Sequence, residues 1–250
     1  MAPLGKKMEL DKIKNNKLYL LISALVCVVL FFLLIRSLFL QSSYLSINMD
    51  LYLLIKNLQN DYFYWMSIFF SLFGDRYIVI PTFVITSVML FGKKEQWLAL
   101  HLIGVVLIAA LLAHVLKNAI AYPRPEIATS TLPSYAFPSR HVTICSAYVT
   151  FLSALIIPQI SSRWFWIIIA CLIVVIESMA RLVLQVHWLT DVIGGALLGA
   201  TCGFLGAYSF FLKPEASINI KSTLTTLLII FLVISVLYSL VIYLVELKLF

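Results

Sequence analysis

The chain has 250 residues, of which 62% are hydrophobic and 12% are charged, and its mean hydropathy is +1.04. Soluble domains are usually about 45–50% apolar and about 25% charged, so this composition indicates an integral membrane protein. The net charge of +7 does not indicate nucleic-acid binding, because the basic residues are scattered between apolar runs.

Seven apolar runs are predicted to cross the membrane, since a spanning helix needs roughly 20 mostly apolar residues. The runs cover 18–40, 77–91, 96–116, 141–159, 164–180, 192–212 and 222–245. The run 77–91 is short and contains Pro81, so we expect its helix to extend by about one turn into the flanking residues. The first run is longer than a signal-peptide core and no small-residue cleavage pattern follows it, which predicts a retained anchor. The expected fold class is therefore all-α, a polytopic membrane helical bundle.

Residues 44–74 do not have the pattern of a simple span. The segment SINMDLYLLIKNLQN mixes apolar positions with Asp50 and Lys56, which is typical of an amphipathic helix lying at the membrane interface. The next segment, YFYWMSIFFSLF at 62–73, is too short to span alone and too apolar to be solvated. We expect it to be interfacial or partly re-entrant.

Positive charge predicts the orientation of the bundle. The segment 1–17 precedes the first span, is rich in lysine and should be cytoplasmic. Alternation then places the loop 117–140 and the segment 181–191 together on the outward side. The basic residues that fall on the cytoplasmic side are Lys93, Lys94, Arg163, Lys213 and Lys221. The basic cytoplasmic face, the anchor and the size favour a bacterial inner-membrane protein with a periplasmic site.

Three groups of charged residues lie at the outward ends of the spans, at 117–125, 138–141 and 181–191. Ionised side chains are expensive at membrane depth, so such groups usually have a function. In the first group Lys117 closes a span and Arg124 lies between two prolines that restrict its backbone. The alternative is that both basic side chains only reach for lipid headgroups.

The second group opens a span. Ser139, Arg140 and His141 follow Pro138 and directly precede an apolar run. Free backbone N–H groups in the first turn of a helix, together with the helix dipole, favour an anion at this position. A histidine there can hold an anion or donate a proton; the alternative is an ordinary helix cap with an interfacial histidine.

In the third group Arg181 ends one span, and His187 and Asp191 begin the next. If that span starts near Val186, the four-residue spacing places His187 and Asp191 on one helix face. A carboxylate beside an imidazole fixes its tautomer, which suits a histidine nucleophile. The alternatives are a purely structural pair and, for Arg181, an ion pair with Glu177 that would weaken it as a phosphate ligand. Together the three groups predict a phosphate pocket.

A stripe of small residues marks the sixth predicted span. Gly195, Gly199 and Gly203 have four-residue spacing and therefore share one helix face. This pattern predicts close packing against a neighbouring helix.

The ordered pattern K-x6-RP, PSxH and R-x5-H-x3-D over about 117–191 resembles the membrane-bound type 2 phosphatidic acid phosphatases, relatives of the vanadium haloperoxidases. The resemblance implies a six-helix phosphatase core within 18–212, with 222–245 as an additional C-terminal span. It implies a lipid phosphatase that acts through a phosphohistidine intermediate.

The resemblance also implies roles for individual residues. His187 would be the nucleophile, Asp191 would orient it, and His141 would protonate the leaving group. The phosphoryl oxygens would be bound by Lys117, Arg124, Ser139 and Arg181.

Two positions depart from the family pattern. Ala180 stands where the family has a serine, so one hydroxyl ligand is missing. Arg140 stands where the family most often has glycine. Its guanidinium either points outward to lipid headgroups or binds a second substrate phosphate.

We expect neither a metal nor a cofactor, because fixed cations can stabilise phosphoryl transfer and a magnesium site would need more carboxylates than Asp191 and Glu126. The predicted partners are membrane lipids and a lipid phosphate or diphosphate substrate. Undecaprenyl diphosphate, phosphatidylglycerophosphate, phosphatidate and a lipid A phosphate all fit. Two alternatives are a phosphotransferase with an acceptor other than water and a lipid transporter or binder that needs no catalytic histidine.

Overall fold

The computed structural model describes residues 17–42, 45–125, 134–213 and 220–248, and these ranges are almost entirely helical. The helices are α2 (Lys17–Phe39), α3 (Ser46–Leu58), α4 (Asp61–Ser71), α5 (Arg76–Gly92), α6 (Gln96–Ile120), α8 (Arg140–Ile156), α9 (Arg163–Val183), α10 (Leu189–Phe210) and α11 (Ile220–Lys248), with the short 3-10 helices η2 (Leu72–Gly74) and η3 (Ile157–Gln159). Within this part of the chain 7 helical segments are long and apolar enough to cross a membrane, which confirms the predicted polytopic bundle. Most of the predicted cytoplasmic segment 1–17, and Glu126, lie outside the described residues.

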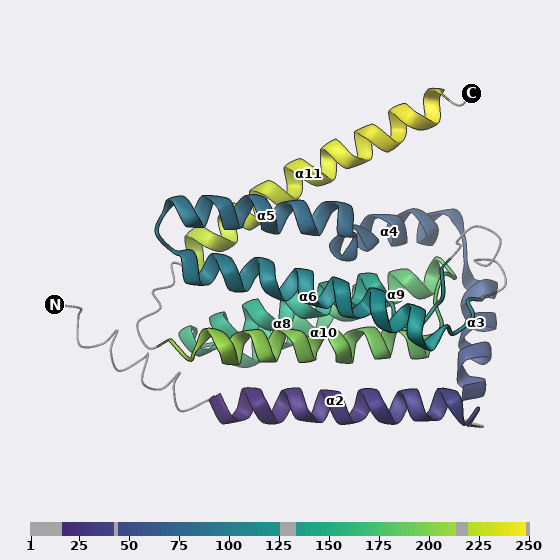
Figure 1. Ribbon diagram of the computed structural model, residues 1–250. Coiled ribbons are helices and arrows are strands. Elements are labelled where there is room, and N and C mark those ends of the chain that lie inside the picture. The colour runs from purple at the N-terminus through teal and green to yellow at the C-terminus, as the bar shows by residue number, and fades with distance from the viewer. Residues whose placement is uncertain (1–16, 43–44, 126–133, 214–219, 249–250) are drawn as a thin grey trace.

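The long helices run alternately in opposite directions along the bundle, as Figure 1 shows. The turn after α6, the turn between α9 and α10, and the start of α8 therefore meet at one end. The helix α3 lies crosswise at this same end (Figure 1), as expected of an amphipathic helix at the interface. Asn48 of α3 donates to the Thr190 hydroxyl at 3.1 Å and accepts from the Thr190 backbone N–H at 3.1 Å, which ties α3 to the start of α10.

The segment 62–73 differs from its prediction. The helix α4 does not lie flat or turn back but continues in line with α5, and Asp61–Gly92 forms a single candidate span of 32 residues (Figure 1). A helix of this length is about 48 Å long, more than the ~30 Å of the hydrocarbon core, so its first turns extend toward the headgroups. The helix is interrupted at η2, and Asp75 starts it again as the N-cap of α5.

The helices α8 and α10 form the most extensive pair and the most buried spans of the bundle. A Cβ atom built on Gly195, Gly199 or Gly203 would lie 2.7, 2.3 or 2.6 Å from a backbone oxygen of α8 or of its N-cap. Such distances are shorter than real Cβ contacts, so only glycine allows this approach. The predicted packing stripe is confirmed, and it fixes the start of α8 against the start of α10.

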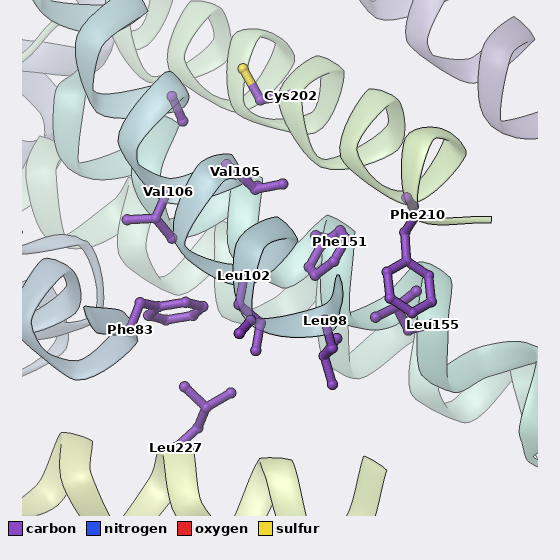
Figure 2. Packing of buried hydrophobic residues seen from close by; sticks show 14 of the residues in the cluster. Phe83, Leu98, Leu102, Val105, Val106, Phe151, Leu155, Cys202, Phe210 and Leu227 are labelled. Carbon is purple, nitrogen blue, oxygen red and sulfur yellow. The ribbon is translucent and has the colours of Figure 1, made fainter. Parts of the chain in front are cut away.

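A large apolar cluster fills the interior of the bundle (Figure 2). The side chains labelled there come from five helices: Phe83, Leu98, Leu102, Val105, Val106, Phe151, Leu155, Cys202, Phe210 and Leu227. Most come from the first half of α6 and the last turns of α8 and α10. Toward the opposite end of the same helices, smaller apolar clusters, such as the one that contains Ala113, Phe137 and Leu198, lie beside the charged groups.

Candidate active site

The structure brings the three charged groups together at the end of the bundle where α3 lies. The backbone N–H of Ser139 donates to the Asp191 carbonyl at 2.9 Å, which joins the second group to the third. The Arg124 guanidinium donates to the Val186 carbonyl, which joins the first group to the third. The side chains that interact electrostatically across the cluster are Lys117, Arg124, Arg140, His141, Arg181, His187 and Asp191. All the predicted site residues therefore lie in one place.

His187 and Asp191 make the predicted contact, with 3.2 Å between Nδ1 and Oδ2. The helical premise behind that prediction is wrong, because α10 begins at Leu189 and the preceding Trp188 is extended. The contact forms because Asp191 reaches back over the start of its helix, where the same Oδ2 accepts from the Trp188 backbone N–H at 2.7 Å. The carboxylate thus caps the helix and holds the imidazole at once.

The imidazole of His187 is buried among positive charges. Burial first, and then the positive charges of Lys117, Arg181 and Arg124, hold the pKa of His187 well below its ordinary value of 6.5. The ring is therefore neutral near pH 7. Nδ1 faces the Asp191 carboxylate, and the neutral tautomer that donates from Nδ1 leaves a lone pair on Nε2.

Neutral backbone oxygens hold the two basic residues of the first group. The buried Lys117 ammonium donates to the carbonyls of Tyr135 and Ala136 at 2.7 and 2.8 Å. Arg124 donates to the Ser134 carbonyl at 2.6 Å and to the Ser134 hydroxyl at 3.0 Å. These contacts fix the directions of both side chains without cancelling their charge, as a phosphate site requires.

The start of α8 contributes further donors. Ser139 is the N-cap of α8, and its fully buried hydroxyl has no hydrogen-bond partner among the residues that the structure describes. The first-turn N–H groups of a helix have no intrahelical acceptors, so this end of α8 is suited to an anion. Buried hydroxyls are normally satisfied, and a phosphoryl oxygen would satisfy this one.

Arg140 lies half-buried beside this N-terminus. Its Nε atom is buried and has no partner within the described part of the chain. Among neighbouring charges, Arg76 acts on it most strongly, followed by Tyr77 and Asp75 at the start of α5. The two guanidinium groups of Arg140 and Arg76 therefore interact electrostatically at the edge of the charged cluster.

Arg181 belongs to the cluster, although Glu177 lies one turn before it. The Arg181 Nη1 atom donates to the Ser71 hydroxyl of α4 at 2.5 Å, and its Nε atom has no partner among the described residues. The fully buried Glu177 attracts Arg181 electrostatically, as the sequence suggested. Arg181 still keeps a donor for a substrate oxygen.

Asp75, which the sequence does not mark as a site residue, lies beside His141. Its Oδ2 atom lies 3.9 Å from Nε2 of His141, at the junction of η2 and α5. A Gly-Asp pair interrupting an apolar segment is the signal in the sequence that marks this junction.

An apolar cavity of about 750 Å³ lies between α8, α9 and α10. Its lining includes Ala196, about two helical turns after the start of α10, and extends to Tyr19 and Leu20 of α2. The cavity therefore follows the helices away from the turn that carries His187.

Comparison with known proteins identifies the family. The model of the PAP2 superfamily matches residues 98–215. An undecaprenyl-diphosphatase from Sulfolobus acidocaldarius is 29% identical over 168 residues, which cover 64% of this chain and 77% of that protein. A phosphatidylglycerophosphatase B from Bacillus subtilis is 31% identical over 137 residues, which cover 53% of this chain and 68% of that protein.

A solved structure agrees with these relatives. It is the crystal structure of a transmembrane PAP2-type phosphatidylglycerolphosphate phosphatase from Bacillus subtilis, with a TM-score of 0.62 and 25% identity. The match covers 74% of this chain and 94% of that one. The family that the three motifs predict is thereby confirmed: the chain belongs to the PAP2 superfamily and is a lipid phosphate hydrolase of the membrane.

Proposed function

We propose that the protein hydrolyses a lipid phosphate or diphosphate through a phosphohistidine intermediate on His187. The observation that supports this most strongly is the buried His187–Asp191 pair, which interacts with the basic side chains of Lys117, Arg124 and Arg181 at the end of the bundle. The proposed site lies on the outward face, which is the periplasmic face if the protein is in a bacterial inner membrane. A transporter or a protein that only binds the headgroup would not need a histidine paired with a carboxylate.

In the first step Nε2 of His187 donates its lone pair to the phosphorus atom, and the bond from phosphorus to the leaving oxygen breaks. Asp191 stabilises the imidazolium character that develops on the ring. His141 gives a proton to the leaving oxygen. A lipid monophosphate therefore leaves as the alcohol, and a lipid diphosphate leaves as the lipid monophosphate. The Lys117, Arg124 and Arg181 side chains bind the equatorial oxygens, where charge accumulates.

In the second step a water molecule attacks the phosphorus atom of phosphohistidine. His141, now neutral, takes the proton from this water, and the bond between phosphorus and Nε2 breaks. Inorganic phosphate leaves, and His187 regains its lone pair. The same histidine thus serves as acid and then as base.

A lipid tail fits beside the site. The apolar cavity between α8, α9 and α10 is lined from Ser146 of α8 to Pro158 of η3, a distance of about 18 Å. This is more than half of the ~30 Å hydrocarbon thickness, so a prenyl or acyl chain would lie along it inside the bilayer. The named activities of the relatives, on undecaprenyl diphosphate and on phosphatidylglycerophosphate, both involve such chains.

A phosphate-release assay on the purified protein with a panel of lipid phosphates and diphosphates tests the proposal. We expect free phosphate to form with water as the only acceptor, at the same rate in EDTA as in magnesium, because fixed cations supply the charge stabilisation. An absolute magnesium requirement would rule out this mechanism. Transfer to an added alcohol without free phosphate would instead identify a phosphotransferase.

Arg140 and the adjacent Arg76 favour a diphosphate as substrate, since one guanidinium could bind the second phosphate in a forked contact. Replacing Arg140 with glycine should lower kcat/KM for a diphosphate lipid by about 10- to 100-fold, the loss of a charge-assisted contact of ~1.5–3 kcal/mol. Activity on a monophosphate lipid with the same tail should change by no more than about threefold. Arg163→Gly is the matched control, because Arg163 is exposed and is also the first residue of its helix. Equal losses on both lipids would refute the second-phosphate role.

A further inference from the structure

The break between α4 and α5 is packed directly against the proposed site. The Ser71 hydroxyl accepts from Arg181, and the Phe73 carbonyl accepts from the Tyr148 hydroxyl of α8 at 2.9 Å. A Cβ on Gly74 would lie 2.5 Å from the His141 backbone oxygen, so no other residue allows the chain to approach α8 so closely. The interruption of the helix therefore serves to bring residue 75 to His141.

The carboxylate of Asp75 has a different neighbour on each oxygen. Its Oδ1 atom accepts from the Tyr77 backbone N–H at 2.7 Å and so caps α5. Its Oδ2 atom lies 3.9 Å from Nε2 of His141 and accepts from the Tyr238 hydroxyl at 3.3 Å. The distance to His141 is that of an ionic contact and is longer than a hydrogen bond. Both side chains are partly accessible, at 17% for Asp75 and 19% for His141.

The seventh span, α11, packs against the junction between η2 and α5. The ring of Phe231 stacks on Phe73 with 5.3 Å between centroids, and the ring of Tyr238 stacks on Tyr77 at 6.2 Å. Phe231 and Tyr238 are seven residues apart and so lie on the same face of α11. This helix lies after residues 98–215, the part of the chain that matches the family model.

We propose that Asp75 is a positioning residue for His141 during protonation of the leaving group, and that α11 holds Asp75 in place through Tyr238. The inference rests on the proposed function, in which His141 is the acid. It gives the site two histidine–carboxylate pairs, one for the nucleophile and one for the proton donor. It also gives the additional C-terminal span a catalytic purpose.

The electrostatic surroundings of His141 explain why such a partner is needed. A proton donor must carry its proton at the working pH, and nearby fixed cations oppose this while a nearby carboxylate favours it. The charged and titratable groups around His141 are Arg140 of its own helix, Lys117, Arg124, Arg181, Glu177, His187 and Asp75. Of the carboxylates, Asp75 is the one in ionic contact with the His141 ring within the described part of the chain.

Asp75→Asn in the full-length protein isolates this role. Asparagine caps a helix about as well as aspartate through its Oδ1 atom, and its Nδ2 group can donate to the Tyr238 hydroxyl oxygen. The start of α5 and the contact with Tyr238 can therefore be kept while the charge is lost. The assay compares a lipid phosphate, whose alkoxide leaving group needs a proton, with p-nitrophenyl phosphate, whose leaving group does not. We expect kcat/KM to fall by about 10- to 100-fold on the lipid phosphate and by less than about threefold on p-nitrophenyl phosphate.

Two further measurements sharpen the test. The basic limb of the pH profile of kcat/KM for the lipid phosphate should move to lower pH in Asp75→Asn, because the donor then loses its proton more readily. Tyr238→Phe keeps the stacked ring but removes the hydroxyl, and it should reproduce the same selective loss at a smaller size. Asp61→Asn, at an exposed position of α4, is the control and should leave both substrates and the profile unchanged.

Equal losses of Asp75→Asn on both substrates, or no loss on either, would overturn the inference, as would an unmoved basic limb. Failure of the underlying function gives a different result. In that case the wild-type protein would release no phosphate from either substrate, or His187→Ala would still release it.

Discussion

Replacing His187 with alanine is expected to lower the rate of phosphate release from any lipid substrate by about 10⁴-fold or more, because it removes the nucleophile that we propose. The geometry argues for this size of effect: the ring is 4% exposed, lies 3.2 Å from Asp191 and is surrounded by cations. Rapid quenching of the wild-type protein with a ³²P-labelled substrate should trap an acid-labile, base-stable phosphoenzyme that His187→Ala does not form.

The matched control is His114→Ala, since His114 is an exposed histidine on α6. That variant should keep wild-type activity and the labelled intermediate. Phosphate release retained in His187→Ala would reject the nucleophile assignment.

The pH dependence of phosphoenzyme formation follows from the same residue. Because burial and the neighbouring cations hold the pKa of His187 well below 6.5, the ring stays neutral as the pH falls through the range where an ordinary histidine would gain a proton. The rate should therefore not decline at the pH where an ordinary histidine becomes protonated, and it should fall only in more acidic solution. The declining limb in Asp191→Asn should be compared with that of the wild type, because Asp191 is the carboxylate that stabilises the protonated ring.

Replacing Gly199 with alanine is expected to unfold the bundle at a clearly lower temperature. The added Cβ would lie 2.3 Å from the Thr143 carbonyl oxygen of α8, and a backbone atom in a packed helix cannot move aside cheaply. Overpacking of this kind destabilises by about 1–3 kcal/mol or more, and it would also separate Ser139 from Asp191. The thermal midpoint in detergent, followed by tryptophan fluorescence, measures the first effect and lipid phosphate hydrolysis the second.

Gly104→Ala is the corresponding control, because a Cβ on this helical glycine of α6 has nothing within 4 Å. It should leave the midpoint unchanged or raise it, since alanine is favoured over glycine in a helix by about 0.5–1 kcal/mol. A midpoint of Gly199→Ala equal to that of Gly104→Ala would contradict the role assigned to the stripe.

The spans and the convergence of the three motifs could be predicted from the sequence because each depends on a local pattern. Apolar length sets the spans, and the alternation of the spans alone places 117–125, 138–141 and 181–191 at one end. The four-residue spacing of Gly195, Gly199 and Gly203 likewise predicts the contact with α8.

What the sequence could not provide were features that depend on contacts between distant segments. The continuation of α4 into α5 and the placement of Asp75 beside His141 depend on how Gly74 packs against α8. Asp191 and His187 do not share a helix face, because Trp188 is extended and His187 therefore precedes α10. The contact forms because the Asp191 side chain reaches back past the start of the helix. No helical periodicity describes such a turn.

The site at the end of the bundle, with an apolar cavity leading away from it, determines how the two products separate. Inorganic phosphate dissolves in water, whereas a dephosphorylated lipid remains dissolved in the bilayer along the direction of α8. The products therefore enter two different phases as soon as they part. The reverse reaction would require each to return from its own phase to the same buried histidine, so partitioning itself drives hydrolysis toward completion.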